Sequence, residues 1–326
     1  HVLLVGMGSI ARSLMEVLKK ERSPFLKYKI TCICPEDIPD YIYRIKPDIH
    51  HIKKALTENN MNKILEPLIS ESCFVVNLSV NVDSIQIMKI CKRHDVLYID
   101  TSIEEYQKPH KPKDPEKLTL YYQEIQLEKE LKKIDSDITH LHSQGLNPGA
   151  VSSLAMRGIM AYCEKYHPEK VRMLKEDKWG QVCRDVLEMI HIAEYDNQEI
   201  KQKFNKNIFR GSWSTEGFYS EAISPAFVAS PTRPDGFKKS KYNKHIYYSP
   251  KLRSMECMTT SICLDPDGEP FEIQGRMITH FEMVSLSDKL GYGKYTPKIT
   301  YVYSSCPISQ KGLEAIQEND YKEPAK

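Results

Sequence analysis

The feature that most constrains the fold is a short apolar strand followed at once by a glycine-containing turn and a helix. Residues 2–5 form a continuous apolar run, as in a strand that is buried on both faces of a parallel sheet. The run leads into Gly6-Met7-Gly8-Ser9-Ile10-Ala11, after which a helical pattern begins. Strand, G-x-G-x-x-A and helix in this order predict a dinucleotide-binding turn.

The small residues of this turn each have a physical role in such a site. Gly6 allows a sharp backbone turn, and Gly8 has no Cβ that would block a pyrophosphate. Ala11 is small enough for the helix to pack closely on the strand. The free N–H groups at the start of the helix, at Ser9 and Ile10, are expected to face the phosphates.

Further strands and helices alternate along the first half of the chain, which indicates βαβ units and a parallel sheet. We expect strands at residues 30–33, 74–77, 96–99 and 138–141, and helices around 60–69, 82–92 and 116–131. The predicted fold class is therefore α/β, with a Rossmann-like, doubly wound parallel sheet.

Polar residues at the predicted strand ends are candidates for contact with the cofactor. Ligands of such sheets bind beyond the carboxyl ends of the strands, where the sequence has Asn77, Ser79, Thr101 and Ser102. Position alone supports a second role equally well, because Ser, Thr and Asn are also the preferred helix caps.

The end of the second strand bears on the choice of cofactor. An acidic residue usually binds the adenine ribose there, but this sequence has Cys34, followed by Glu36 and Asp37 as possible replacements. No arginine stands at this position to hold a 2′-phosphate, which favours NAD over NADP.

A Gly- and Pro-containing turn around residues 144–150 ends the predicted sheet, and a helix is expected to begin near Val151. We therefore expect a dinucleotide-binding domain at residues 1–147 and an α+β domain for substrate binding and dimerisation at 148–326. Alternating apolar and polar residues predict strands at 276–280 and 298–303 in the second domain.

The composition excludes several classes of protein. The formal net charge is only +2, which argues against a nucleic-acid partner or an anionic membrane surface. No run of 18 apolar residues or signal-like start is present, so we expect a cytoplasmic protein. The nine cysteines include no C-x-x-C pair and lie mostly in apolar runs, so we expect free thiols and no metal.

Several motifs together resemble those of the homospermidine synthases, which are saccharopine-dehydrogenase-like enzymes. The resemblance spans nearly the whole chain. The sequence differs from the family's usual motifs at Glu105, Tyr106, Tyr195 and Asn197. In order, the motifs are GMGSIA, NLSVNV (77–82), YIDTSIE (98–104), GLNPGAVS (145–152), HIAEYDNQ (191–198), WSTEGFYSE (213–221), MITHFEMVSLSD (277–288) and YTPKITYVY (295–303).

The resemblance implies an NAD-dependent aminobutyltransferase. Such an enzyme joins two putrescines, or spermidine and putrescine, to sym-homospermidine through an imine, with NAD as a prosthetic group that shuttles hydride. It also implies roles for six residues. Glu194 and Glu221 would orient the ammonium groups of the substrate by charge-assisted hydrogen bonds. Glu104 and Asn147 would hold the reacting amine. Trp213 would attract the cation with its indole, and His280 would relay protons.

Asn147 is in addition expected near the cofactor. The resemblance implies a homodimer and a C-terminal continuation. The absence of an initial Met predicts that the sequence is a trimmed piece. Two alternatives stay open: an NAD(P)-dependent reductive amination of the saccharopine or carboxynorspermidine type, and a non-catalytic NAD-binding sensor.

Overall fold

The computed structural model describes residues 1–106 and 114–321. By their internal contacts, these residues divide into two compact units. Residues 1–106 and 124–150 form the first unit, and residues 114–123 and 151–321 form the second. The predicted boundary at 147–148 lies close to the later division, but a single boundary did not anticipate that 114–123 pack with the second unit.

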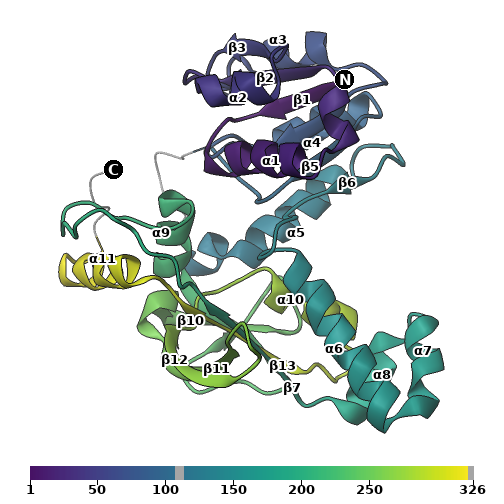
Figure 1. Ribbon diagram of the computed structural model, residues 1–326. Coiled ribbons are helices and arrows are strands. Elements are labelled where there is room, and N and C mark those ends of the chain that lie inside the picture. Colours follow the sequence, from purple (N-terminus) through teal and green to yellow (C-terminus); the bar gives the residue numbers. More distant parts are fainter. Residues whose placement is uncertain (107–113, 322–326) are drawn as a thin grey trace. The chain divides into compact units, whose positions relative to one another are not determined.

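The first unit contains a six-stranded sheet in the order β3-β2-β1-β4-β5-β6, with helices packed against it (Figure 1). Each neighbouring pair of strands is parallel, as predicted, and the order is that of a Rossmann sheet. The strands are β1 (Val2–Val5), β2 (Ile30–Cys34), β3 (His50–Lys53), β4 (Phe74–Asn77), β5 (Leu97–Asp100) and β6 (His140–Leu141).

Short helices connect these strands. Alanine, methionine and isoleucine side chains of α1 and α2 pack with the apolar residues of β1 and β2 in one core cluster. The helices are α1 (Ser9–Lys20), α2 (Asp40–Ile45), α3 (Met61–Leu65), α4 (Ser84–Arg93) and α5 (Leu120–Leu131), and α5 begins in the second unit and ends in the first.

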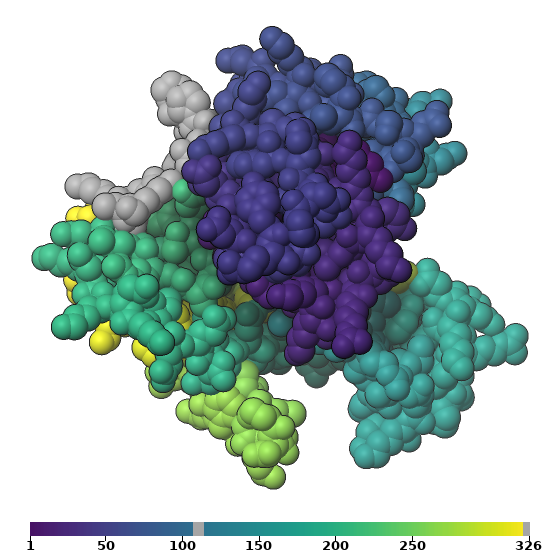
Figure 2. All heavy atoms as spheres, turned by 45° about the horizontal axis from the view of Figure 1, so that its top comes forward, coloured from purple at the N-terminus to yellow at the C-terminus, as the bar shows by residue number. Residues whose placement is uncertain are grey.

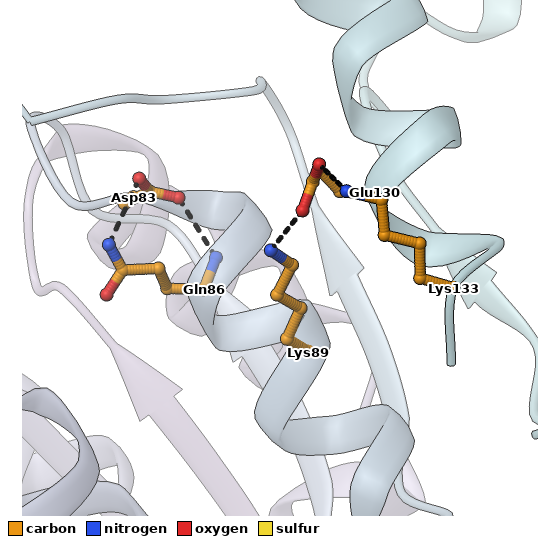
Figure 3. A network of polar contacts seen from close by, with 5 residues as sticks. All are labelled: Asp83, Gln86, Lys89, Glu130 and Lys133. Carbon is orange, nitrogen blue, oxygen red and sulfur yellow. Dashed lines mark hydrogen bonds and ion pairs between the residues drawn. The ribbon is translucent and has the colours of Figure 1, made fainter. Parts of the chain in front are cut away.

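Polar contacts hold α4 to the end of α5 within the first unit (Figure 3). Asp83 caps α4 by accepting a hydrogen bond from the Gln86 backbone N–H at 2.9 Å. One turn further on, Lys89 pairs with Glu130 at 2.6 Å, and Lys133 contacts the same carboxylate. The hydrogen bonds from these lysines lower the pKa of Glu130 to about 2, so it stays ionised across the physiological range.

The second unit is built on a seven-stranded sheet in the order β11-β12-β13-β8-β10-β9, with β7 paired in addition to β13. Only β7 runs parallel to its partner, and the other paired strands are antiparallel. The strands are β7 (Met189–Tyr195), β8 (Pro225–Ala229), β9 (Lys238–Lys239), β10 (Ile246–Arg253), β11 (Met258–Leu264), β12 (Pro270–Arg276) and β13 (Lys298–Ser304).

The turn of the β11–β12 hairpin, drawn in yellow-green in Figure 2, protrudes from the surface of this unit. The helices of the second unit are α6 (Ala150–Tyr166), α7 (Val171–Lys175), α8 (Trp179–Val186), α9 (Thr215–Ile223), α10 (Glu282–Leu290) and α11 (Pro307–Glu318). The predicted α+β class of this part of the chain is confirmed.

The segment 114–123 is anchored to the second unit by a buried carboxylate. Glu116 is fully buried, and its Oε1 accepts hydrogen bonds from the Tyr121 hydroxyl and the Lys241 backbone N–H, both at 2.9 Å. The Tyr121 ring packs edge-on against Phe227 of β8, with centroids 5.0 Å apart.

One predicted strand, at residues 276–280, is wrong. Strand β12 ends at Arg276, and residues 277–280 continue as an irregular segment. Ile278 and His280 are nevertheless buried, with 1% and 5% of their surface exposed. Thr279, between them, is buried too, so the alternation that predicted a strand corresponds neither to alternating burial nor to pairing with a neighbouring strand.

Among the described residues, no helix is long and apolar enough to cross a membrane. The nine cysteines are free thiols, and seven of them are buried.

Candidate functional site

The residues that were predicted to contact the cofactor lie where strands of the first sheet end. Strands β1, β4, β5 and β6 are neighbours in that order and parallel, so their carboxyl ends form one edge of the sheet. The turn after β1 contains Gly6, Gly8, Ser9 and Ile10. Strand β4 ends at Asn77 and is followed by Ser79, and β5 is followed by Thr101 and Ser102. The loop after β6 contains Asn147.

Gly6 is required by the backbone. Its φ is +89°, and a Cβ built on it would lie 2.8 Å from the carbonyl oxygen of Leu78 and from the N and Cα atoms of Ser79. The turn after β1 therefore touches the loop after β4 directly, and only glycine permits this approach.

Gly8 has a different environment, which fits a bound phosphate group. A Cβ built on Gly8 would meet no atom within 4 Å, and Gly8, Ser9 and Ile10 are exposed. Gly8 is also the N-cap of α1, whose first backbone N–H groups have no side-chain cap. Open space beside uncapped N–H groups at the start of a 12-residue helix is the geometry that anions bind.

Asn77 lies inside the unit rather than on its surface. It is 2% exposed, and its Oδ1 accepts a hydrogen bond from the Ser79 hydroxyl at 2.6 Å. Its Nδ2 donates to the Tyr98 hydroxyl at 3.0 Å. Asn77 thus fixes the position of Ser79, which is the more accessible of the two.

Glu104 is held by its own loop, after β5, and by the segment that follows β4. Its carboxylate accepts hydrogen bonds from the Ser102 hydroxyl at 2.9 Å and from the Asn81 backbone N–H at 3.1 Å. Two hydrogen bonds join the backbone of Glu104 to Ser84 at the start of α4. The Glu104 N–H donates to the Ser84 hydroxyl, and the Ser84 N–H donates to the Glu104 carbonyl.

Asp100 is a buried titratable residue of this region that sequence analysis did not single out. Its carboxylate accepts hydrogen bonds from the Tyr98 hydroxyl at 2.7 Å and from the Ser143 backbone N–H at 2.6 Å. Burial raises its pKa to about 7, with a smaller contribution from the charge of Glu104, although the two hydrogen bonds lower it. The available signal was its place at the end of a buried strand.

The tip of β2 carries mixed charges. Cys34 is buried, and its thiol lies 3.3 Å from Nε2 of His51. Asp37 is exposed and forms an ion pair with Lys53 at the end of β3, at 2.6 Å. An acidic and a basic group are therefore both present where a cofactor ribose would be selected.

The loop that contains Asn147 is a compact turn with a cis Asn147–Pro148 peptide bond. The Gly145 N–H donates to the Pro148 carbonyl at 2.7 Å. Gly149 has φ +123°, and a Cβ there would lie 2.7 Å from the Gly145 carbonyl oxygen, so the turn requires glycine at this position.

In the second unit, four of the predicted site residues lie in an acidic and aromatic region. Glu194 is on β7, and it accepts a hydrogen bond from the hydroxyl of Tyr301 on β13. The Tyr301 ring packs against the His280 ring with centroids 4.9 Å apart. Nδ1 of His280 pairs in turn with the carboxylate of Glu282, which is 1% exposed.

The charges around His280 change its pKa. Burial alone lowers the pKa, because it disfavours the imidazolium. The hydrogen bond to Glu282 and the negative charges of Glu221 and Glu194 outweigh burial, so the pKa lies above its ordinary value. Burial and the contact with Glu194 keep the pKa of Tyr301 well above 10, so its hydroxyl remains a donor.

Trp213 lies just before α9, and its indole is held by a hydrogen bond at the N–H edge and by an aromatic ring on its face. Its Nε1–H donates to the hydroxyl of Tyr303 at 3.2 Å. Phe218 packs on the indole with centroids 5.4 Å apart. Ser214 caps α9 by accepting from the Gly217 N–H at 3.1 Å, which fixes the start of the helix that carries Glu221.

The tyrosines of β13 are the site residues that sequence analysis missed, although their motif was noted. Tyr301 and Tyr303 are two positions apart on one strand, so their side chains lie on the same face. This spacing was a usable signal, but their partners Glu194 and Asp196 are more than a hundred residues away in the sequence.

Comparisons with known proteins agree with the resemblance predicted from the motifs. Residues 2–140 match the family model of the saccharopine dehydrogenase NADP-binding domain. The homospermidine synthase of Mesorhizobium japonicum is 29% identical over 320 residues, which cover 93% of this chain and 65% of that protein. The homospermidine synthase of Blastochloris viridis is 26% identical over 324 residues, which cover 94% of this chain and 66% of that one. The chain thus spans slightly less than two thirds of these relatives.

Solved structures show the same fold. The crystal structure of a homospermidine synthase from Legionella pneumophila in complex with NAD has a TM-score of 0.80 at 19% identity, and the match covers 99% of this chain and 69% of that one. Apo saccharopine dehydrogenase from Saccharomyces cerevisiae has a TM-score of 0.51 at 14% identity, covering 97% of this chain and 57% of that one. The predicted fold is confirmed, and so is the resemblance of this chain to the homospermidine synthases over nearly all of its length.

Proposed function

We propose that the protein is a homospermidine synthase, an NAD-dependent transferase that joins two putrescines, or spermidine and putrescine, to sym-homospermidine. The observation that carries the proposal is the gathering of Glu194, Glu221 and Glu282 around His280 and Tyr301 in the second unit. Putrescine is a dication at neutral pH, so its binding requires carboxylates to pair with its ammonium groups.

The residues at the edge of the first sheet are suited to NAD. Gly8, with the backbone N–H groups of Ser9 and Ile10, would receive the pyrophosphate. Ser79, Thr101, Ser102 and Asn147 would lie toward the riboses and the nicotinamide. When bound, NAD supplies the hydride acceptor and donor, and the net redox change of the reaction is zero.

The protein's own groups bind the amines and move protons. Glu194 and Glu221 would orient the ammonium groups, and Trp213 would attract the cation by a cation–π contact of about 0.5–2 kcal/mol. Glu104 and Asn147 would hold the amine that reacts. This amine must lose a proton before its carbon is oxidised to an imine, and His280, with its raised pKa, would relay protons through Glu282.

The test is incubation of the purified protein with NAD and putrescine, without added NADH, followed by chromatography for homospermidine and ammonia. We expect homospermidine and equimolar ammonia, with no build-up of NADH. Accumulation of NADH without homospermidine would contradict the proposal and favour a dehydrogenase of the saccharopine type. NAD binding without turnover of any diamine would favour the sensor.

Two variants show whether turnover comes from the proposed site. Glu221→Gln removes one of the carboxylates near His280 and should reduce kcat/KM about tenfold or more, because a charge-assisted contact to the substrate is lost. Glu269→Gln changes a carboxylate in the exposed turn of the β11–β12 hairpin and should leave kcat/KM unchanged.

We also propose that the enzyme acts in the cytoplasm as a homodimer. Both statements remain predictions from the sequence and from the resemblance. Sedimentation of the purified protein would test the dimer directly.

A further inference from the structure

We propose that Tyr303 and Asp196 are positioning residues that hold the indole of Trp213 in the orientation required for the cationic substrate. The inference rests on the proposed function, because a fixed indole face is useful only if a cation binds to it. Neither Tyr303 nor Asp196 has to touch the substrate in this account.

A directional chain of hydrogen bonds links the three side chains. The Trp213 Nε1–H can only donate, and it donates to the Tyr303 hydroxyl at 3.2 Å. The Tyr303 hydroxyl then donates its own proton to Oδ2 of Asp196 at 3.1 Å. Each donor has one partner in this order, so the chain fixes which way the indole edge points.

Asp196 is itself firmly held. Its Oδ2 accepts a second hydrogen bond from the Ser212 hydroxyl, and its Oδ1 accepts one from the Gln198 N–H at 3.0 Å. Asp196 is 8% exposed and Tyr303 6% exposed, so the chain lies in a poorly solvated environment, where hydrogen bonds to a carboxylate are strong.

The Tyr303 hydroxyl keeps its proton over the working pH range. Burial raises its pKa well above the ordinary value, and the charge of Asp196 raises it further. Tyr303 can therefore donate to Asp196 throughout this range.

Packing fixes the indole in its remaining directions. The Phe218 ring lies against the indole and also meets the Tyr303 ring edge-on at 5.3 Å. A Cβ built on Gly217 would lie 3.1 Å from Cζ3 of Trp213, so the start of α9 packs closely on the indole and a larger residue at 217 would press against it.

The pairing of β7 and β13 explains why this arrangement belongs to the site. In their parallel register, Tyr301 lies opposite Ile192 and Tyr303 opposite Glu194. Each tyrosine reaches diagonally forward to the next carboxylate on its face, Tyr301 to Glu194 and Tyr303 to Asp196. The same two strands thus set the position of Glu194 and, through Tyr303, that of the indole.

Trp213 can be observed directly, because the chain has only two tryptophans. In a Trp179→Phe background, Trp213 is the sole indole, and Tyr303→Phe removes its hydrogen-bond acceptor without removing the ring. We expect an emission maximum at longer wavelength, more quenching by acrylamide, and a loss of kcat/KM for putrescine of about five- to tenfold. The larger part of the loss should fall on kcat, because orientation matters most in the transition state.

Two further variants separate positioning from a general loss of structure. Tyr295→Phe is the control, because it too removes one tyrosine hydroxyl, which donates to the Leu187 carbonyl at 2.6 Å. It should leave Trp213 emission and the kinetic constants unchanged. Asp196→Asn keeps an acceptor for Tyr303 but not the charge, so its emission and kcat should lie between those of wild type and Tyr303→Phe. It also serves if Tyr303→Phe does not fold.

Unchanged emission, quenching and kcat in Tyr303→Phe would overturn the inference, as would equal effects of Tyr295→Phe. The fluorescence measurements need no turnover. If wild type made no homospermidine, the proposed function would fail, while the emission and quenching would still report whether Tyr303 and Asp196 hold the indole.

Discussion

The same substitution at two glycines of one turn should affect different properties: stability at Gly6 and NAD binding at Gly8. Gly6→Ala places a Cβ on a residue with φ +89°, which costs about 1–3 kcal/mol in backbone strain. The Cβ would also lie 2.8 Å from backbone atoms of Leu78 and Ser79, and moving packed backbone costs about another 1–3 kcal/mol. The free energy of unfolding should therefore fall by about 2–6 kcal/mol.

Gly8→Ala is the matched change. Its φ is −75°, and a Cβ there would meet no atom within 4 Å, so the only expected cost is the N-cap preference for glycine over alanine, at most about 1 kcal/mol. The new methyl group would occupy the space proposed for the pyrophosphate. NAD affinity should fall about tenfold or more while the protein stays folded.

Urea denaturation gives the free energy of unfolding of both variants, and titration calorimetry gives the dissociation constant of NAD. The reasoning would be refuted if Gly6→Ala were as stable as wild type. It would equally be refuted if Gly8→Ala bound NAD with undiminished affinity.

Three further predictions follow from the titratable and aromatic groups. The pKa of Asp100 is raised to about 7 from an ordinary value near 3.9, so between these pH values the folded state holds a proton that the unfolded state releases. The free energy of unfolding should therefore fall by up to about 4 kcal/mol as the pH rises from 4 through 7. Urea denaturation of Asp100→Asn should show a free energy of unfolding that depends less on pH. Glu282→Gln removes a charge that raises the pKa of His280, so the limb of the kcat profile due to His280 should move to lower pH. Trp213→Phe should retain more of kcat/KM than Trp213→Ala, by about threefold or more, because a phenyl ring still offers a π face to the cation.

The first sheet was predicted well because its signals are local. The strands at residues 2–5 and 74–77 have the predicted bounds, and the glycine turn lies where the motif places it. The exception is β3 at His50–Lys53, a partly exposed edge strand in which Ile52 is the one apolar residue, so no apolar run reveals it.

Even in this unit, the buried face of a helix depends on its neighbours. The spacing of Ile10, Leu14, Val17 and Leu18 suggests one buried face of α1. Leu18 does pack against the core cluster, yet Ile10 and Val17 are 48% and 54% exposed, whereas Ala11 and Met15 are 1% exposed. Ile10 stands at the open end of the glycine turn, and the core of the sheet selects the neighbouring face of the helix.

The candidate site in the second unit could be predicted only in part. The resemblance identified Glu194, Trp213, Glu221 and His280, because their motifs are contiguous in the sequence. The partners that hold them depend on the parallel pairing of β7 with β13, which nothing in the local sequence specifies. Tyr301 and Tyr303 therefore emerged as candidate site residues only from the structure, and so did the contact of Asp196 with Tyr303.

The proposed reaction is tested most directly by the fate of deuterium in the substrate. Putrescine deuterated at both carbons next to nitrogen is incubated with the protein and NAD, in the presence of excess unlabelled NADH, and homospermidine is analysed by mass spectrometry. If the cofactor stays bound between oxidation of the amine and reduction of the imine, the product should keep all of its deuterium. A product that has lost one deuterium for every bond formed, or no homospermidine at all, would contradict the account.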